Sequence, residues 1–313
     1  MRDTPFVLVL GGSGFIGRHL VARLGVEGCR LIIPTRHFEP AKDLLVVPGV
    51  EDVVEADVHN DAVLDRLIEG KDAVINLVGI LHSRPAAGNA RYGPDFARVH
   101  VDLPRRVAAA CAAHGVKRYL HMSALGASFD APSMYLRSKA DGEVAAFWNP
   151  DVDVTAFRPS VVFGEDDNFL NLFARMQKHF PLIPLACADA KFQPVYVHDV
   201  VQAFAAALRD IRTIDNVYSL VGPRVYTLRE LVKLAGMYSG NQRPVIELPS
   251  PLARMQAWTL EHLSDAPLMS RDNLDSMKID CVADCSRELE LGIVPTALEA
   301  VAPVWLARRQ ATP

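Results

Sequence analysis

Long apolar runs are missing from this chain of 313 residues. The apolar stretch that begins at Phe6 ends at Gly11, and no segment reaches the roughly 18 apolar residues that a membrane-spanning helix needs. The stretch is also too short for the core of a secretory signal. We therefore expect no transmembrane segment and a cytoplasmic location, while peripheral attachment to the inner membrane stays open.

Cysteine is scarce and irregularly spaced. The five cysteines stand at positions 29, 111, 187, 281 and 285, an odd number that predicts no disulfide framework. Cys281 and Cys285 lie close together, but no second pair of cysteines or histidines accompanies them, whereas zinc takes four ligands. The sequence therefore predicts no metal site and fits a reducing cytoplasm.

The sequence also lacks any concentration of positive charge. The net charge is −4, and the sequence contains no basic run and no stripe of alternating basic and aromatic residues. Nucleic acid is therefore not expected as a partner. With 50% hydrophobic and 22% charged residues, the composition is ordinary for a globular protein of one large domain or one and a half.

Short apolar runs alternate with longer amphipathic segments through the first half of the chain. The runs predict buried strands, and the segments between them predict helices. The expected strands are residues 6–10, 30–34, 50–55, 73–77, 118–122 and 152–157, and the expected helices are residues 15–24, 62–69, 99–114 and 133–148. Such alternation predicts an α/β fold with a parallel sheet covered on both faces, a doubly wound sheet of the Rossmann type.

After residue 159 the pattern loosens and prolines become more frequent. The expected elements there are helices at 168–179, 199–209, 228–238 and 252–263 and strands at 193–197 and 217–221. We predict that residues 1–160 and 192–222 form the Rossmann-type domain. Residues 161–191 and 223–313 are expected to form a smaller substrate or lid domain.

A glycine-rich loop joins the first expected strand to the first expected helix. It reads Gly11-Gly12-Ser13-Gly14-Phe15-Ile16-Gly17. Glycines allow a tight turn and close approach of a diphosphate to the backbone, and the helix N-terminus offers free N–H groups to it. A plain tight turn is the alternative, but the flanking strand and helix favour dinucleotide binding.

The end of the second expected strand bears on the choice of dinucleotide. An NAD site usually places an acidic residue there to accept from the ribose hydroxyls. This chain has Thr35-Arg36-His37, and Arg36 is suited to pair with a 2′-phosphate. The alternatives are a solvated surface arginine and, because Glu39 lies near, NAD(H). We favour NADP(H) as cofactor.

Tyr135 and Lys139 stand four residues apart, so on a helix they share one face. A tyrosine can pass a proton to a carbonyl or from an alcohol while hydride moves to or from a nicotinamide. An ammonium close to the phenol favours the phenolate, so we expect a lowered pKa for Tyr135. An ordinary surface pair is the alternative, but the pair follows the glycine loop and the fifth strand in the order that a cofactor-lining role needs.

The glycine spacing resembles that of the short-chain dehydrogenase/reductase superfamily, and Gly14-Phe15-Ile16-Gly17 resembles its extended branch. The resemblance implies that Asp57-Val58 holds the adenine edge and that Leu77-Val78-Gly79 lies beside the adenosine ribose. It also implies a hydroxyl at the end of the fifth strand that orients the substrate oxygen. Ser123 fills this place, or Ala124 occupies it and leaves Ser128 or Ser133 as substitutes. His100 stands where the superfamily commonly has Asn, and a satisfied helix histidine is its alternative interpretation.

Several later segments narrow the resemblance. They are residues 158–171, 193–200, 220–223, 270–273 and 291–296. Together they resemble bacterial relatives of the 39-kDa accessory subunit of respiratory complex I. That resemblance implies a tightly bound NADPH without established turnover, and it places Pro159 and Val162 near the nicotinamide amide. The nucleotide-lining residues that it implies are Gly11, Ser13, Gly14, Phe15, Ile16, Gly17, Arg36, Asp57, Tyr135 and Lys139.

Two functions from different classes remain open. The first is an oxidoreductase or epimerase-like enzyme with Tyr135 as proton donor or acceptor, Lys139 as its electrostatic support and Ser123 as oxygen clamp. The second is a structural or assembly module that the dinucleotide stabilises. The segment 252–263 is expected to be a lid helix over the cleft at the carboxyl ends of the strands, with docking to a partner or a membrane surface as the alternative. The sequence does not identify the small-molecule substrate.

Overall fold

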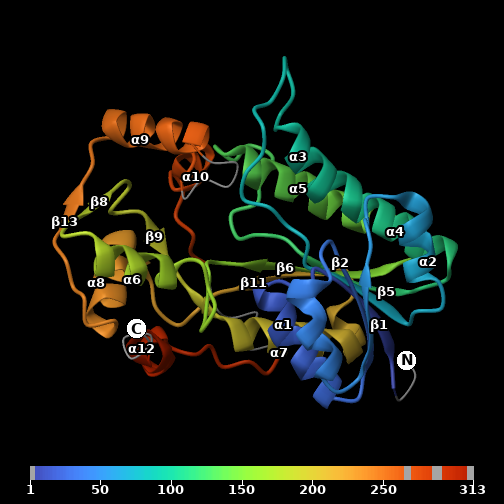
Figure 1. Cartoon of the computed structure of the whole chain (residues 1–313). Helices are drawn as coiled ribbons and strands as arrows, with labels where there is room; N and C mark the ends of the chain where they lie inside the picture. Colours follow the sequence, from blue (N-terminus) through green and yellow to red (C-terminus); the bar gives the residue numbers. More distant parts are fainter. Residues whose placement is uncertain (1–3, 264–268, 284–290, 309–313) are drawn as a thin grey trace.

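Seven parallel strands form the central sheet of the computed structural model, which describes residues 4–263, 269–283 and 291–308 (Figure 1). They lie in the order β11-β6-β5-β4-β1-β2-β3. Their bounds are β1 (Phe6–Leu10), β2 (Arg30–Thr35), β3 (Val50–Glu55), β4 (Ala73–Asn76), β5 (Arg118–Met122), β6 (Asp153–Pro159) and β11 (Asn216–Leu220). The strand order reverses between β1 and β4, and ligands of doubly wound sheets bind at such a point. The predicted parallel α/β sheet is confirmed.

Helices cover both faces of this sheet, as its apolar strands require. One face carries α1 (Phe15–Val26) and α7 (Val197–Arg209), and the other carries α2 (Asp61–Ile68), α4 (Leu103–Ala113) and α5 (Met134–Phe147) (Figure 1). Because successive side chains of a strand point to opposite faces, β1 contributes Val7 and Val9 to the core under α1 and α7 and Leu8 and Leu10 to the core under α4. The glycine loop is therefore fixed between two buried cores.

The helix that precedes β5 differs from its prediction. It begins with α3 (Pro94–Phe96) and passes through a π-helical segment, η2 (Ala97–Asp102), before α4, so helical structure starts five residues before the expected residue 99. Pro94 suits the first turn because its missing N–H has no helical partner there. A Cβ on Gly142 of α5 would lie 2.0 Å from the carbonyl oxygen of His100, so α5 packs directly on the π-helical segment.

The second part of the molecule has its own buried cluster, which includes Phe163, Phe173, Leu231 and Trp305. Its helices are α6 (Leu170–His179), α8 (Leu228–Tyr238), α9 (Ser250–Leu263), α10 (Arg271–Ser276) and α12 (Leu298–Arg308). Three two-stranded pairs join them: β7 (Val162–Phe163) with β10 (Val195–Tyr196), β8 (Ile183–Leu185) with β13 (Val245–Glu247), and β9 (Lys191–Phe192) with β12 (Tyr226–Thr227). Short 3₁₀ helices η1 (Glu39–Val46) and η3 (Ile211–Thr213) complete the described elements.

The expected strand at 193–197 is wrong in most of its length. Only Val195 and Tyr196 pair, with the two residues of β7. The Gln193 side chain donates to the carbonyl oxygen of Gly222, and Val197 already begins α7. The expected strand at 217–221 is confirmed as β11, which joins the central sheet beside β6.

Candidate functional site

The glycine loop is packed so tightly that two of its glycines leave no room for a side chain. A Cβ on Gly17 would lie 2.2 Å from the carbonyl oxygen of Gly11. Gly11 has φ +79°, which favours glycine, and a Cβ there would lie 3.1 Å from the carbonyl carbon of Leu77. The loop is thus pressed between the first turn of α1 and the end of β4.

The N-terminus of α1 has no side-chain cap. Gly14 is the N-cap residue, and its extended backbone (φ −80°, ψ 178°) leads directly into the helix. The first N–H groups of a helix lack intrahelical acceptors and carry a partial positive charge. An uncapped N-terminus beside closely packed glycines therefore fits a diphosphate, as the sequence predicts for Ser13, Phe15 and Ile16 together with the glycines.

Two alanine substitutions separate the fold of this loop from its binding role. Gly17→Ala is expected to destabilise the nucleotide-free protein by about 2 kcal/mol or more because the new methyl group overlaps the Gly11 carbonyl. A Cβ on Gly14 would meet only that same oxygen, at 3.3 Å. Gly14→Ala should therefore keep the melting temperature within about 3 °C. It should weaken NADPH binding at least about tenfold, because a Cβ obstructs close approach of the diphosphate. Equal effects of the two variants on the melting temperature would contradict this division, and thermal melts with titration calorimetry measure both.

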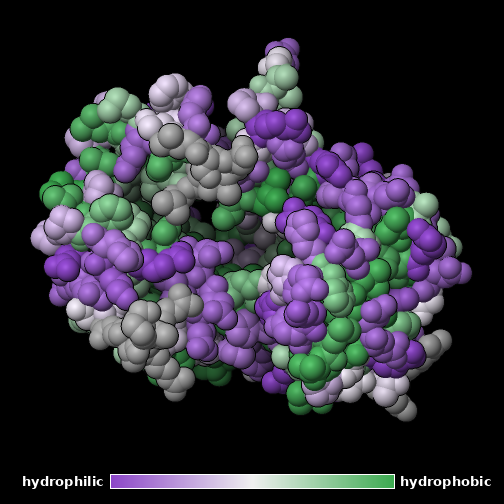
Figure 2. Space-filling view, in the orientation of Figure 1, coloured by the Kyte–Doolittle hydropathy of each residue, from purple (hydrophilic) through white to green (hydrophobic). Residues whose placement is uncertain are grey.

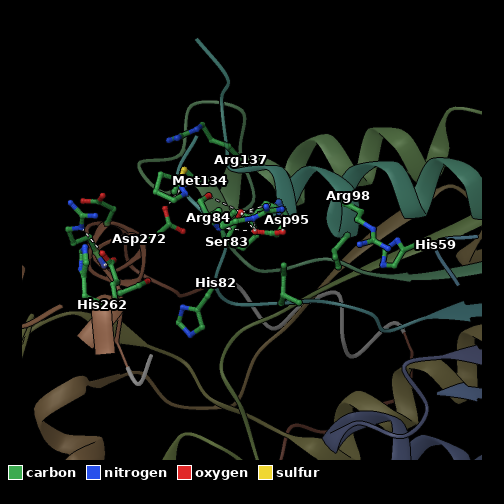
Figure 3. Close-up of a pocket in the computed structure, with 18 of the residues that line it drawn as sticks. His59, His82, Ser83, Arg84, Asp95, Arg98, Met134, Arg137, His262 and Asp272 are labelled. Carbon is green, nitrogen blue, oxygen red and sulfur yellow. Dashed lines mark hydrogen bonds and ion pairs between the residues drawn. The ribbon is translucent and has the colours of Figure 1, made fainter. Parts of the chain in front are cut away.

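A cavity of about 1360 Å³ runs along the carboxyl edge of the sheet toward α9 and α10. Figure 2 shows the molecule hollowed between its two parts, and Figure 3 shows polar residues that line the cavity. Of the residues predicted to bind cofactor, Arg36 and Asp57 lie in its wall. Volumes of typical ligand sites are about 300–1,000 Å³, so this cavity has room for more than one small molecule.

Arg36 is exposed at one end of this cavity, beside Asp57, His59 and Arg98. Among the described residues, Arg36 has no ion-pair partner. Asp57 accepts the N–H of His59 at 2.9 Å and lies 3.7 Å from the Arg98 guanidinium. Glu39 is the nearby acidic residue that leaves NAD(H) as the alternative cofactor. Its carboxylate forms an ion pair with Lys42 at 2.7 Å.

Lys139 lies where the ends of β4 and β5 meet α5. Its Nζ donates to the carbonyl oxygen of Met122 at 3.2 Å, and a Cβ on Gly79 would lie 3.3 Å from the same Nζ. The Tyr135 ring centroid lies 6.0 Å from Nζ. Tyr135 and Lys139 therefore share one face of α5, as their spacing predicts, and the end of β4 is brought to the same place.

The expected lowering of the Tyr135 pKa is wrong. Burial raises the pKa of the Tyr135 phenol well above its usual value, and the nearby Cys281 and Asp272 raise it further. The ring packs edge to face against the stacked rings of Phe96 and His100, with centroids 6.0 and 5.5 Å away. Burial also lowers the pKa of Lys139 to about 8, against an opposing effect of Glu143. Desolvation thus dominates both groups and shifts the pKa of each toward its uncharged form.

Lys139→Met should stabilise the nucleotide-free protein at neutral pH. Below about pH 8 the lysine is charged in both the folded and the unfolded chain, so the full cost of burying the ammonium is present. Between about 8 and the ordinary 10.5 only the unfolded chain keeps the proton, so this cost falls as pH rises and vanishes above that range. The difference between the two pKa values corresponds to about 3 kcal/mol.

The measurement is a series of thermal melts from pH 7 to pH 10. The gain from Lys139→Met should shrink with rising pH, whereas the exposed control Lys233→Met should show no such trend. A stability difference that does not depend on pH would contradict the buried ammonium.

Ser123 is buried, with a side chain 3% exposed, and its N–H donates to the carbonyl oxygen of Phe157 at 2.7 Å. Its Oγ has no hydrogen-bond partner among the residues that the structure describes. Buried polar atoms without partners are rare, and such an atom suits a site that a ligand completes. Of the two predicted substitutes, Ser133 caps α5 through the N–H of Leu136, and Ser128 accepts the N–H of Asp130.

His100 is a satisfied helix histidine, in agreement with one of its two interpretations. Its Nε2 accepts the N–H of Ile80 at 3.1 Å, so Nδ1 carries the proton and donates to Ser138 Oγ at 2.8 Å. Ser138 in turn donates to the carbonyl oxygen of Tyr135 at 2.7 Å. Burial, followed by the charges of Lys139 and His121, holds the pKa of His100 well below its usual value. The neutral imidazole therefore joins the loop after β4 to α5, a connection that the sequence did not reveal.

The remaining predicted residues lie around this centre. The N–H of Leu77 donates to Leu10, and that of Val78 donates to Asn76 Oδ1, so the chain continues beyond β4 in a fixed path. Val58 packs against the core under α4. Pro159 accepts the N–H of Leu125 at 2.9 Å, and Val162 begins β7.

The predicted absence of a zinc site rested on Cys281 and Cys285. The Cys281 Sγ lies 3.3 Å from Ser160 Oγ, and Cys285 lies outside the described residues. Within the described residues, no group of three or more side chains is suited to hold a metal ion.

Helix α9 forms part of the cavity wall. Arg254, Trp258, Glu261 and His262 line the cavity, and the Trp258 and His262 rings lie 4.4 Å apart. Leu252 and Met255 of the same helix are exposed. In the part of the chain that the structure describes, no helix is both long and apolar enough to cross a membrane.

A doubly wound sheet with a glycine loop at its first crossover and a Tyr/Lys pair at its carboxyl edge defines a short-chain dehydrogenase/reductase-like protein. The sequence pattern of the NAD dependent epimerase/dehydratase family matches residues 7–221, more than half of the chain. The chain belongs to this family, which is built to bind a nicotinamide dinucleotide.

Two known proteins that are similar to this chain differ from each other in kind. One is the mitochondrial NADH dehydrogenase (ubiquinone) 1 alpha subcomplex subunit 9 of Mus musculus, 33% identical over 93% of this chain and 77% of its own length. Another is a ceramide reductase of Caulobacter vibrioides, 30% identical over 78% of this chain and 74% of its own length. The predicted relation to the complex I subunit is thereby confirmed.

The solved structure of a UDP-glucuronic acid 4-epimerase from Bacillus cereus has the same fold. It matches with a TM-score of 0.73 and covers 98% of this chain and 100% of its own, at 19% identity. At that identity the likeness concerns the fold alone.

Proposed function

We propose that this protein is an NADP(H)-dependent oxidoreductase that acts on a carbonyl or alcohol group. The observation that carries the proposal is the juxtaposition of Lys139, a buried lysine with a pKa of about 8, with Tyr135 at the edge where β4 and β5 end. A buried ionisable pair costs stability and is typical of acid–base sites. The Caulobacter reductase among its relatives supports a catalytic role.

The residues present fit a nicotinamide dinucleotide. The tight glycines and the uncapped N-terminus of α1 would hold the diphosphate, and Arg36 would pair with the 2′-phosphate. When bound, the nicotinamide supplies or accepts hydride. Lys139 would donate hydrogen bonds to the nicotinamide ribose. Val58, Leu77, Val78 and Gly79 would line the adenosine half, and Pro159 and Val162 the nicotinamide amide.

The proton is the part of the reaction that the chain itself supplies. Tyr135, with its raised pKa, is protonated at neutral pH and is suited to donate to a carbonyl oxygen. The free Oγ of Ser123 would donate a hydrogen bond to that same oxygen. Both donors favour the direction in which a carbonyl is reduced to an alcohol.

The preference for NADP(H) over NAD(H) is supported by two observations. Arg36 forms no ion pair with a described residue, so its guanidinium is available to bind a phosphate. Glu39 forms an ion pair with Lys42. A carboxylate paired with a lysine is a poorer acceptor for the ribose hydroxyls that NAD offers.

We also propose the two-part division of labour that the sequence suggests. Residues 1–160 and 192–222 would bind the dinucleotide, and residues 161–191 and 223–313 would close over the substrate. The separate buried cluster around Phe163, Leu231 and Trp305 and the contribution of α9 and α10 to the cavity wall support it.

The test is oxidation of NADPH by the purified protein in the presence of a panel of carbonyl compounds, including long-chain and sugar-derived ketones. The proposal predicts consumption of NADPH with at least one class and slower consumption of NADH. If no carbonyl oxidises either reduced dinucleotide, and no alcohol reduces the oxidised forms, the enzymatic proposal fails.

A second candidate function is a structural or assembly subunit of a membrane-bound respiratory complex that NADPH stabilises. Its support is the 33% identity to the mouse subunit across 93% of this chain. At a thousandfold excess over the dissociation constant, a bound ligand adds about 4 kcal/mol to stability. This function predicts a large fall in melting temperature when the nucleotide is removed, peripheral association with the complex, and no turnover on any carbonyl.

A further inference from the structure

The carboxylate of Asp272 reaches from α10 to the first turn of α5. Its Oδ1 accepts the N–H of Met134 at 2.6 Å, and its Oδ2 accepts the N–H of Tyr135 at 3.0 Å. Asp272 also lies in the wall of the large cavity, and Figure 3 shows it beside Met134. The second part of the molecule thus contacts the backbone of the tyrosine itself.

The local side-chain cap of α5 serves a different N–H group. The N-terminus of α5 is already capped by Ser133, which accepts the N–H of Leu136 at 3.2 Å. Helix α10 has its own capping box, formed by Ser270 and Asn273. Asp272 is therefore an additional acceptor on a helix that has a cap.

Burial of the Asp272 carboxylate is electrostatically costly, and the hydrogen bonds from Met134 and Tyr135 offset only part of that cost. Burial raises the pKa of Asp272, and Asp275 raises it further. The guanidinium of Arg137 is the nearby cation, but it donates to the carbonyl oxygens of residues 91, 131 and 132 instead of forming an ion pair with Asp272. A partly buried carboxylate held without a direct cationic partner lowers stability, and such groups are more often kept for function.

Both backbone polar groups of Tyr135 consequently form hydrogen bonds with side chains. Its N–H is fixed by Asp272 of α10, and its carbonyl oxygen is fixed by Ser138, which receives a hydrogen bond from His100. His100 in turn accepts the N–H of Ile80, in the chain that leaves β4. The backbone of Tyr135 therefore links α10 to the chain that leaves β4.

We propose that Asp272 is a positioning residue through which the substrate-side part of the chain fixes Tyr135 for proton transfer. The proposal rests on the proposed function, because it takes Tyr135 as the proton donor. It adds that the donor is set in place only when α10 is docked on α5. The same contact places a negative charge near the phenol.

Burial is the main reason that Tyr135 stays protonated, and the charge of Asp272 acts in the same direction. The groups that face the phenol are Lys139 from α5, His100 from η2, Cys281 from the segment after α10, and Asp272 itself. Asp272 and Cys281 raise the pKa of Tyr135, and His100 is neutral. A phenol kept protonated serves as an acid, which suits reduction of a carbonyl.

The experiment compares Asp272→Asn with Asp275→Asn in the full chain bound to NADPH. Asp275 lies one turn later on α10 and pairs with Arg254 and Lys278, so its variant removes an equal charge without touching α5. Nuclear magnetic resonance follows the chemical shifts of the Met134 and Tyr135 amide protons during acidification. It also measures the rate of hydrogen exchange at the same two amides. In the unmodified chain both signals should shift together, with a midpoint above the ordinary aspartate pKa of 3.8.

Asp272→Asn should abolish this shared titration and speed exchange at the two amides at least about tenfold. It should also change the nicotinamide fluorescence of bound NADPH while the dissociation constant stays within about twofold, since the glycine loop is untouched. Asp275→Asn should keep the shared titration, with a lower midpoint because Asp275 raises the pKa of Asp272, and should leave the exchange rates, the fluorescence and the affinity unchanged. Unaltered amides and fluorescence in Asp272→Asn, or the same changes in Asp275→Asn, would overturn the proposal. Failure of every variant and of the unmodified chain to bind NADPH would defeat the proposed function instead, while the amide titration still decides whether Asp272 holds Tyr135.

Discussion

Arg36→Asp is expected to weaken NADPH binding about a hundredfold or more and to leave NADH binding within about threefold. The substitution removes a charge-assisted hydrogen bond to the 2′-phosphate, worth about 1.5–3 kcal/mol, and places a like charge beside it. Since each 1.4 kcal/mol is tenfold in affinity, the combined loss reaches about two orders of magnitude. NADH has no phosphate at that position and loses only the contact with the adenosine.

The control for this variant is Arg105→Ala. Arg105 is an exposed arginine on α4 that does not line the cavity, so its loss tests a general effect of removing positive charge. Titration calorimetry with both reduced dinucleotides measures the two affinities. Equal losses of affinity for NADPH and NADH in Arg36→Asp would contradict the role of Arg36 in binding the 2′-phosphate. NAD(H) would then be the favoured cofactor.

Tyr135→Phe should abolish turnover while the affinity for NADPH stays within about twofold. General acid catalysis contributes about 10²–10⁴-fold, and the variant lacks the proton that the reaction needs. The ring itself keeps its packing against Phe96 and His100, so the backbone contacts of the site remain. The measurement is the steady-state rate with the best carbonyl found for the unmodified chain, together with NADPH affinity.

Ser123→Ala is the matched comparison for that experiment, because it removes a hydroxyl at the same edge without touching the proton donor. It should slow the reaction less than Tyr135→Phe. Turnover that survives in Tyr135→Phe at more than about a tenth of the original rate would exclude the phenol as the acid.

The sequence predicts the first half of the fold closely because each strand there is a continuous buried run followed by its own crossover helix. β1, β3 and β5 have the expected bounds, and β6 begins one residue later and ends two residues later than expected. Prediction fails where the paired strands are short and lie far apart in the sequence. Val195 and Tyr196 pair with two residues that lie 33 positions earlier, and nothing in the local pattern marks that contact.

Prediction of the site shows the same limit. The four-residue spacing of Tyr135 and Lys139 correctly places them on one helix face, but spacing carries no information on burial, which sets the direction of their pKa shifts. Asp272 reaches Met134 across 138 residues, and the sequence offered only the segment 270–273 as part of a family resemblance, without a role. The hydrogen bonds of His100 likewise depend on a π-helical turn that periodicity alone does not predict.

Calorimetric titration of the nucleotide-free protein with NADPH, NADP⁺, NADH and NAD⁺ tests the central claim, which is that the backbone around Gly14 receives a dinucleotide diphosphate. We expect all four to bind competitively at one site, the two phosphorylated forms more tightly, and each to raise the melting temperature. Absence of both heat and thermal protection with all four would contradict this claim, and with it the cofactor-binding and catalytic roles of Arg36, Tyr135 and Lys139.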